Sequence, residues 1–251
     1  GGETWEKKID GNAAETVLGD HYKAKIAAGD QSLEVYLEQV KFNTQGGAVL
    51  PYLGVHFEDE KVGYVVGAFG SIVKTDDGGD TWMPWLEHIE NPDFLHLNEI
   101  KKLGSDLYIV GEQGSVWKWS VTDNMFRRQA TGYGGSLFGI IGNANYLLTF
   151  GLGGNAFRSD DAGETWHPVQ TGAKAALTAG DVLEGGLPIL VAENGGVFVG
   201  DEFWRSFQRR MLPGGTFSAG IKSFNGDAKR VVLAGYNGIG LRLLESPERR
   251  P

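Results

Sequence analysis

Two stretches of the chain repeat one phrase, KTDDGGDTWMPW at Lys74–Trp85 and RSDDAGETWHPV at Arg158–Val169. In both, two aspartates are followed by glycine, threonine and tryptophan. Aspartate side chains accept backbone N–H bonds and close turns, while glycine permits left-handed backbone. The tryptophan supplies a large apolar surface for packing between sheets. We therefore expect each phrase to be a structural turn between strands and not a catalytic pair of carboxylates.

The pattern S/T-x-D-x-G-x-T-W is the Asp-box, also called the BNR repeat. We assign to it Asp76, Gly78, Thr81 and Trp82 in the first phrase, and Asp160, Gly163, Thr165 and Trp166 in the second. Two further units lack the phrase but keep an aromatic residue at the packing position. It is Phe126 in one unit, and Trp204 or Phe207 in the other.

A glycine-rich hairpin repeats along the chain, as in VGAFGSIVKT from Val66. Its second glycine recurs at Gly70, Gly114, Gly154, Gly195 and Gly238, with gaps of 40 to 44 residues. Each hairpin joins two short apolar runs. A period of about 40 to 45 residues with several short strands per unit is typical of a β-propeller. The sequence therefore predicts an all-β propeller of four-stranded antiparallel blades, in a single domain over residues 1–251.

We expect five blades, at about residues 53–86, 97–129, 137–170, 177–210 and 217–244. Residues 1–9 are predicted to be the outer strand of a blade. Two explanations of this strand remain open: it completes the last blade and closes a ring of five, or further blades precede it. Residues 12–42 show helical spacing of apolar residues, such as Leu18, Tyr22 and Ile26, and predict a short helical insert that packs on the propeller.

Composition excludes several classes of function. The net charge of −9 argues against a nucleic-acid binder, which needs cations to neutralise phosphates. The chain has no cysteine, so disulfides and thiolate metal sites are excluded. No apolar run is long enough to span a membrane. His88 and His96 lie near Asp93, but their spacing matches no zinc pattern. We expect neither a metal nor a cofactor.

Taken together, the motifs resemble the photosynthesis system II stability/assembly factor-like family of Asp-box propellers. The matching stretches are VGYVVGAFGSIVKTDDGGDTWMPW, NPDFLHLNEI, YIVGEQGSV and FGLGGNAFRSDDAGETWHPV, over most of residues 53–200. The resemblance implies a seven-bladed propeller, with five blades visible here, and a role in assembling a membrane complex. The helical insert resembles the non-photosynthetic bacterial members, which are associated with membrane export systems. This implies a periplasmic or otherwise extracytoplasmic location.

These observations predict a non-enzymatic scaffold that binds a protein partner, in a membrane complex or export system. Hairpin tips and inter-blade loops are expected to share one face of the propeller. The candidate contact residues on that face are Phe69, Phe94, Tyr133, Tyr236, Glu112, Gln113, Asn194 and Asn237. The alternative is a sialidase-like glycoside hydrolase or a carbohydrate-binding propeller. It is less favoured, because the arginines do not recur once per blade as a substrate-carboxylate cluster would require.

Overall fold

A computed structural model describes residues 3–4, 6–8, 11–45, 51–210, 218–224, 227–235 and 238–244. The chain divides into two compact parts, and each is described by itself. The first part comprises residues 1–102, 107–109 and 117–128, and the second comprises 103–106, 110–116 and 129–251.

The described strands form five antiparallel sheets that follow one another along the chain. The first holds β1 (Tyr52–Phe57), β2 (Gly63–Gly67), β3 (Ile72–Thr75) and β4 (Met83–Pro84), and the second holds β5 (Leu97–Leu103), β6 (Asp106–Gly111), β7 (Ser115–Ser120) and β8 (Met125–Ala130). The third holds β9 (Leu137–Gly142), β10 (Leu147–Gly151), β11 (Ala156–Ser159) and β12 (His167–Val169), and the fourth holds β13 (Leu177–Val182), β14 (Pro188–Ala192), β15 (Val197–Gly200) and β16 (Phe207–Arg210). The fifth holds β17 (Ser218–Phe224), β18 (Asp227–Gly235) and β19 (Gly238–Leu243).

Each sheet pairs its strands in chain order, which is the topology of a propeller blade. The all-β propeller fold predicted from the repeats is therefore confirmed. The fifth sheet has three strands among the described residues. The total of seven blades stays a prediction.

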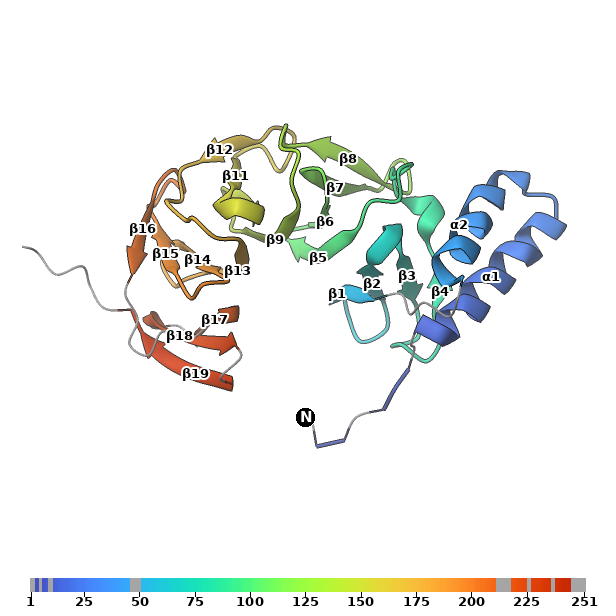
Figure 1. Cartoon of the computed structure of the whole chain (residues 1–251), viewed down its shortest axis with the longest axis horizontal. Coiled ribbons are helices and arrows are strands. Elements are labelled where there is room, and N and C mark those ends of the chain that lie inside the picture. Colours follow the sequence, from blue (N-terminus) through green and yellow to red (C-terminus); the bar gives the residue numbers. More distant parts are fainter. Residues whose placement is uncertain are drawn as a thin grey trace, which may run out of the picture. The chain divides into compact units, whose positions relative to one another are not determined.

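Within each part, successive sheets pack side by side. In the second part β13 lies between β9 and β17 (Figure 1). In the first part β1 approaches β5 so closely that a Cβ on Gly54 would lie 3.0 Å from the Cα of Glu99. The central strands β2, β10 and β14 are buried along their whole length. They are covered on both faces, which explains their unbroken apolar sequences.

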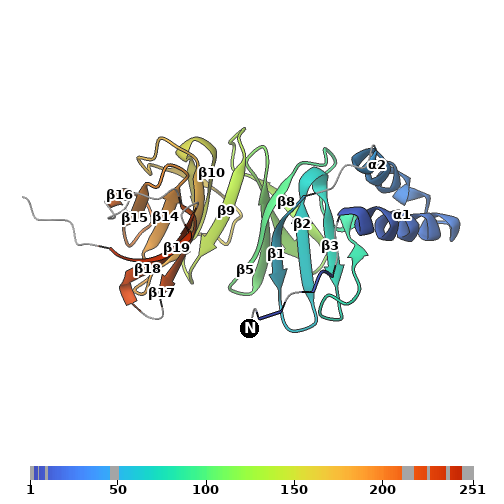
Figure 2. The same ribbon diagram turned by 60° about the horizontal axis from the view of Figure 1, so that its bottom comes forward.

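The segment 12–42 is helical, as predicted. It forms α1 (Gly11–Ala27), the short turn η1 (Gln31–Leu33) and α2 (Glu34–Thr44). The two helices pack together, and α1 also contacts β4, on the side of the first sheet away from β1 (Figures 1 and 2). The buried Tyr22 anchors α1, because its hydroxyl donates to the Glu87 carboxylate at 2.7 Å and accepts from the Leu86 amide at 3.3 Å.

The predicted outer strand at residues 1–9 is not present in the described part of that segment. Residues 3–4 and 6–8 form no strand, and Trp5 lies outside the described residues. Lys8 instead pairs with Glu6 at 3.1 Å and with Asp80 at 2.9 Å. A strand needs the backbone ladder of a neighbour, and the described strands supply none to this segment.

Candidate functional site

The two repeated phrases form turns with matching hydrogen bonds. In the first, the Asp77 carboxylate accepts from the Thr81 amide at 2.9 Å and from the Thr81 hydroxyl at 2.6 Å. The Gly79 amide donates to the Thr75 hydroxyl at 2.9 Å. Asp161, Thr165, Gly163 and Ser159 make the corresponding bonds in the second phrase. The turn-closing residues therefore have purely structural partners.

These bonds shift the assignment made from the sequence by one position. The carboxylates that close the turns are Asp77 and Asp161, where Asp76 and Asp160 were expected, and Gly79 takes the place given to Gly78. The physical reason is that Asp76 and Asp160 point back along the preceding strand. Asp76 pairs with Lys74 at 2.7 Å, and Asp160 pairs with Arg158 at 3.0 Å.

The turn carboxylates are unsuited to proton donation. Bonds from the Thr81 hydroxyl and amide lower the pKa of Asp77 to about 2. Burial opposes ionisation of Asp161, but the bonds from Thr165 outweigh it and lower the pKa of that carboxyl to about 2. A general acid needs a raised pKa. These aspartates therefore cannot serve the acid role of a glycoside hydrolase.

The fourth sheet keeps the turn chemistry, although its sequence lacks the phrase. Asp201 accepts from the Phe203 and Arg205 amides at 3.0 Å, and from the Ser206 amide at 2.9 Å. Trp204 fills the aromatic position, since it is 0% exposed whereas Phe207 is half-buried. A lone aspartate five residues before a serine was the signal that sequence reasoning missed.

The hairpin tips repeat a left-handed backbone. Gly70, Gly114, Gly154 and Gly195 have φ values of 70°, 60°, 81° and 79°. A Cβ on Gly70 would lie 3.2 Å from the Cα of Phe94, and one on Gly154 would lie 2.6 Å from the carbonyl oxygen of Ala173. These two tips therefore lie against the loop that leads to the next sheet. A single face shared by all the tips stays a prediction.

The aromatic candidates differ in how much of each ring is available. Phe69 is 41% exposed and packs edge-on against His96, with ring centroids 4.8 Å apart. Phe94 is half-buried and contacts Tyr36 of α2. Tyr133 is half-buried, and its hydroxyl donates to the Leu152 carbonyl at 2.9 Å. Phe69 is therefore the most accessible of the three rings.

The polar candidates are in part tied to their own loops. Gln113 and Asn194 are exposed, and Glu112 is half-buried. The Asn194 side-chain oxygen accepts from the Gly196 amide at 3.1 Å. Tyr236 and Asn237 lie outside the described residues. The role of all these residues in binding stays a prediction.

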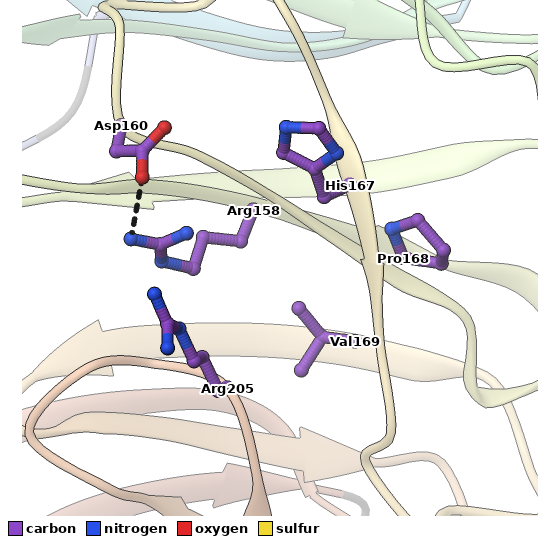
Figure 3. Close-up of a pocket in the computed structure, with 6 residues that line it drawn as sticks. All are labelled: Arg158, Asp160, His167, Pro168, Val169 and Arg205. Atoms are coloured by element: carbon purple, nitrogen blue, oxygen red, sulfur yellow. Dashed lines mark hydrogen bonds and ion pairs between the residues drawn. The ribbon is translucent and has the colours of Figure 1, made fainter.

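A pocket in the second part was not predicted. It has a volume of about 440 Å³ and is lined by Arg158, Asp160, His167, Pro168, Val169 and Arg205 (Figure 3). Arg158 lies on β11 and pairs across the ladder with His167 of β12. Arg205 comes from the Asp201 turn of the following sheet. The guanidinium groups of Arg158 and Arg205 lie next to each other (Figure 3).

Arg158 is held in place but incompletely hydrogen-bonded. It is 6% exposed, and its guanidinium carbon lies 4.3 Å from the ring centroid of Tyr146. Its Nη2 donates to Asp160, while its Nε has no hydrogen-bond partner among the described residues. Arg205 makes no ion pair in the described part of the chain. The pocket lining thus holds two guanidinium groups and one carboxylate, which pairs with Arg158, so the lining carries excess positive charge.

The sequence offered little to identify this pocket. Lys74 occupies the position of Arg158 in the first phrase and makes the same kind of pair, with Asp76. The lysine also lies 5.3 Å from the ring of Trp85. The distinguishing feature is Arg205, which lies 47 positions after Arg158 and reaches it only through the turn of the next sheet.

The described residues were also searched for a metal site and for a membrane-spanning helix. Within them, no group of three or more histidine, aspartate or glutamate side chains is arranged to hold a metal ion. Among the helices of the described residues, none is long and apolar enough to cross a membrane.

Comparison with known proteins gives the family. The model of the family described as photosynthesis system II assembly factor YCF48 matches residues 29–212. The chain belongs to this family. The match covers the four sheets from β1 to β16 and α2, and it agrees with the family that the repeated motifs resemble.

Solved structures of family members share the fold at low sequence identity. One, described as "YCF48 bound to D1 peptide", is 18% identical with a TM-score of 0.57, and the alignment covers 80% of this chain and 69% of that one. Another, YCF48 from Cyanidioschyzon merolae, is 13% identical with a TM-score of 0.59 and the same coverage. A search of curated proteins gave no match.

Proposed function

We propose that this YCF48-family chain is a non-enzymatic accessory factor that binds a peptide segment of a membrane-complex subunit. In this proposal the Arg158 pocket receives a carboxylate of the bound segment, either an acidic side chain or a free carboxyl end. The Asp201 turn, which carries Arg205, contacts the neighbouring part of the segment.

The observation that carries the proposal is that two arginines line one pocket, and only Arg158 is paired with its carboxylate, Asp160. Arg158 is buried and fixed on β11, and Arg205 reaches the same space from the next sheet. Guanidinium groups bind carboxylates with planar, charge-assisted hydrogen bonds, and these are the strong ones. A carboxylate seated between the two side chains gains two cationic partners. The relative described as bound to a D1 peptide supports a peptide ligand.

Fluorescence polarisation tests this proposal directly. The probe is a short labelled peptide with glutamates and a free carboxyl end, and its counterpart has glutamines and an amidated end. We expect the acidic probe to bind more tightly, with an affinity that falls as salt is added. Arg205→Glu should weaken acidic-probe binding by about tenfold or more, because it removes one cation and adds a like charge.

Arg209→Glu is the matched control. Arg209 is exposed on β16, carries the same charge and does not line the pocket. Both variants change an exposed side chain, so both should fold normally. Equal loss of binding in the two variants would show that only general charge matters, and the pocket assignment would then be wrong.

The membrane-complex partner is tested by affinity capture. The chain serves as bait for detergent-solubilised membranes of its source organism, with Arg205→Glu in parallel. We expect one complex to be retained by the native chain and lost with the variant. Retention of the same complex by both baits would place the binding site elsewhere.

We also propose an extracytoplasmic site of action, which fits a chain that has no cysteine to oxidise. Fractionation of cells that carry the tagged full-length protein tests this location. Recovery with cytoplasmic markers would refute it.

A further inference from the structure

An apolar groove lies in the first part, between α2 and the loop that follows β4. Its volume is about 370 Å³. We call it the α2 groove, and its apolar lining consists of Val35, Tyr36, Ile89, Pro92, Phe94 and Met125. Neither the Arg158 pocket nor the turn aspartates contribute to it.

The walls of the groove are pre-formed. The Tyr36 ring stacks on the buried Tyr22 ring, with centroids 5.9 Å apart, and meets Phe94 edge-on at 6.3 Å. The Asn91 side chain clamps the loop, since it donates to the Leu95 carbonyl and accepts from the Leu95 amide, both at 3.0 Å. Binding of a ligand in this groove therefore requires little ordering of the loop backbone, and its entropic cost is small.

The loop that follows β4 also has a strained backbone. Phe94 has a φ of 49°, a conformation that a bulky residue rarely adopts. Such strain persists only where the surroundings impose it, and it clusters at binding sites. Here it is imposed by the Asn91 clamp on one side and by Gly70 of the hairpin tip on the other.

Two exposed apolar side chains of α2 lie at and beyond the groove. Val35 is 54% exposed, and Phe42, seven residues later on the same side of the helix, is 67% exposed. The Tyr36 hydroxyl makes no hydrogen bond to the described residues. The surface of α2 beside the groove thus offers two apolar side chains and the Tyr36 hydroxyl to a partner, with the polar Glu38 and Gln39 between Val35 and Phe42.

Acidic residues predominate in and beside the groove lining, although Arg127 lies close enough to Glu90 to interact with it electrostatically. Glu90 is the only charged residue of its lining, and it forms no ion pair in the described part of the chain. Its carboxylate accepts a hydrogen bond from the Arg128 backbone amide at 3.2 Å. The exposed Glu34 and Asp93 are the chain neighbours of the lining residues Val35 and Phe94. A basic partner therefore fits the groove, and an acidic partner is repelled.

We propose that the α2 groove binds a partner segment in which an apolar side chain lies next to a lysine or arginine. The apolar side chain packs between Tyr36 and Phe94, and the basic group pairs with Glu90. This site is independent of the carboxylate-binding pocket and selects the opposite charge. It makes the chain a two-site adaptor.

Labelled peptides test the proposal on the full chain. The probe has two central leucines flanked by lysines, with one counterpart flanked by glutamates and another with serines in place of the leucines. We expect the lysine–leucine probe to bind about tenfold or more tightly than either counterpart, because each counterpart loses one of the two interactions.

Two substitutions locate the site. Val35→Lys puts a charge into the groove and should abolish binding, and Glu90→Lys should reverse the preference toward the glutamate-flanked probe. Val17→Lys is the matched control, since Val17 is a 41% exposed valine of α1 outside the groove. Arg205→Glu should leave binding of the lysine–leucine probe unchanged, which separates this site from the carboxylate pocket.

Three outcomes would overturn the inference. One is binding that ignores the flanking charge, and another is equal loss of binding with Val17→Lys. The third is failure of every probe to bind, together with a dimer in sedimentation equilibrium that Val35→Lys dissociates. That result would make the groove a contact between copies of this chain.

Discussion

Trp204 provides the sharpest test of how these blades are held together. It is 0% exposed, and its indole N–H donates to the Gly186 carbonyl at 2.9 Å. It adopts a φ of 58°, a left-handed conformation that costs roughly 1–2 kcal/mol for a residue with a side chain. Burial must outweigh that cost for the turn to form.

The loss of stability expected for Trp204→Ala can be calculated from the surface that the side chain buries. A tryptophan buries about 150–250 Å², which at about 25 cal/mol per Å² amounts to roughly 4–6 kcal/mol. The measured range for comparable truncations is about 3–5 kcal/mol. We therefore expect Trp204→Ala to lower the free energy of unfolding by about 3–5 kcal/mol, and the melting temperature by roughly 6–20 °C.

Urea unfolding followed by far-UV circular dichroism measures the effect without relying on the removed fluorophore. Phe203→Ala is the matched control, since Phe203 is the preceding residue and is 51% exposed. It should cost less than about 1 kcal/mol. Trp82 is only half-buried, so Trp82→Ala should cost less than Trp204→Ala. A Trp204→Ala loss no larger than that of Phe203→Ala would refute the packing role assigned to this aromatic position.

Three further predictions follow from single contacts. The pKa of Asp77 is lowered to about 2, so its contribution to stability is complete above about pH 4 and is lost as the pH falls through about 2. Asp77→Asn should therefore make the free energy of unfolding depend less steeply on pH over that range. Gly154→Ala should destabilise more than Gly172→Ala, because both have positive φ but only Gly154 would place a Cβ against backbone; thermal unfolding that ranks them equally would contradict this. Tyr22→Phe should cost about 1–3 kcal/mol and raise amide hydrogen exchange in α1, because the hydroxyl bonds two groups of the turn that follows β4; unchanged exchange would show that α1 is held by packing alone.

The repeats made most of the fold predictable. Glycines that recur every 40 to 44 residues each demand a left-handed tip, and that requirement is local to the backbone. The strands follow from the short apolar runs between the tips. The helical segment was predictable for a similar reason, because Leu18 and Tyr22 lie one turn apart and are both buried.

The turn chemistry was predictable in kind but not in detail. The pattern S/T-x-D-x-G-x-T-W, read from Thr75, places its aspartate at Asp77, so the assignment to Asp76 was wrong by one position. The structure adds the partners, since Asp77 bonds Thr81 while Asp76 pairs with Lys74. The Asp201 turn could not be recognised from the pattern. Its bonds depend on where the Ser206 amide lies in space, and its sequence departs from the repeated phrase.

Features that depend on neighbours along the chain could therefore be predicted from the residues alone, namely the blade period, the hairpin tips, the helical segment and the family. The residues that form the Arg158 pocket and the α2 groove are brought together only by the packing of whole elements. Arg158 and Arg205 meet because adjacent sheets bring β11 beside the following turn, and Tyr36 meets Phe94 because α1 contacts β4 and α2 packs on α1. Such contacts join residues far apart in the chain, and the free energy of packing whole elements selects them, so no local pattern records them.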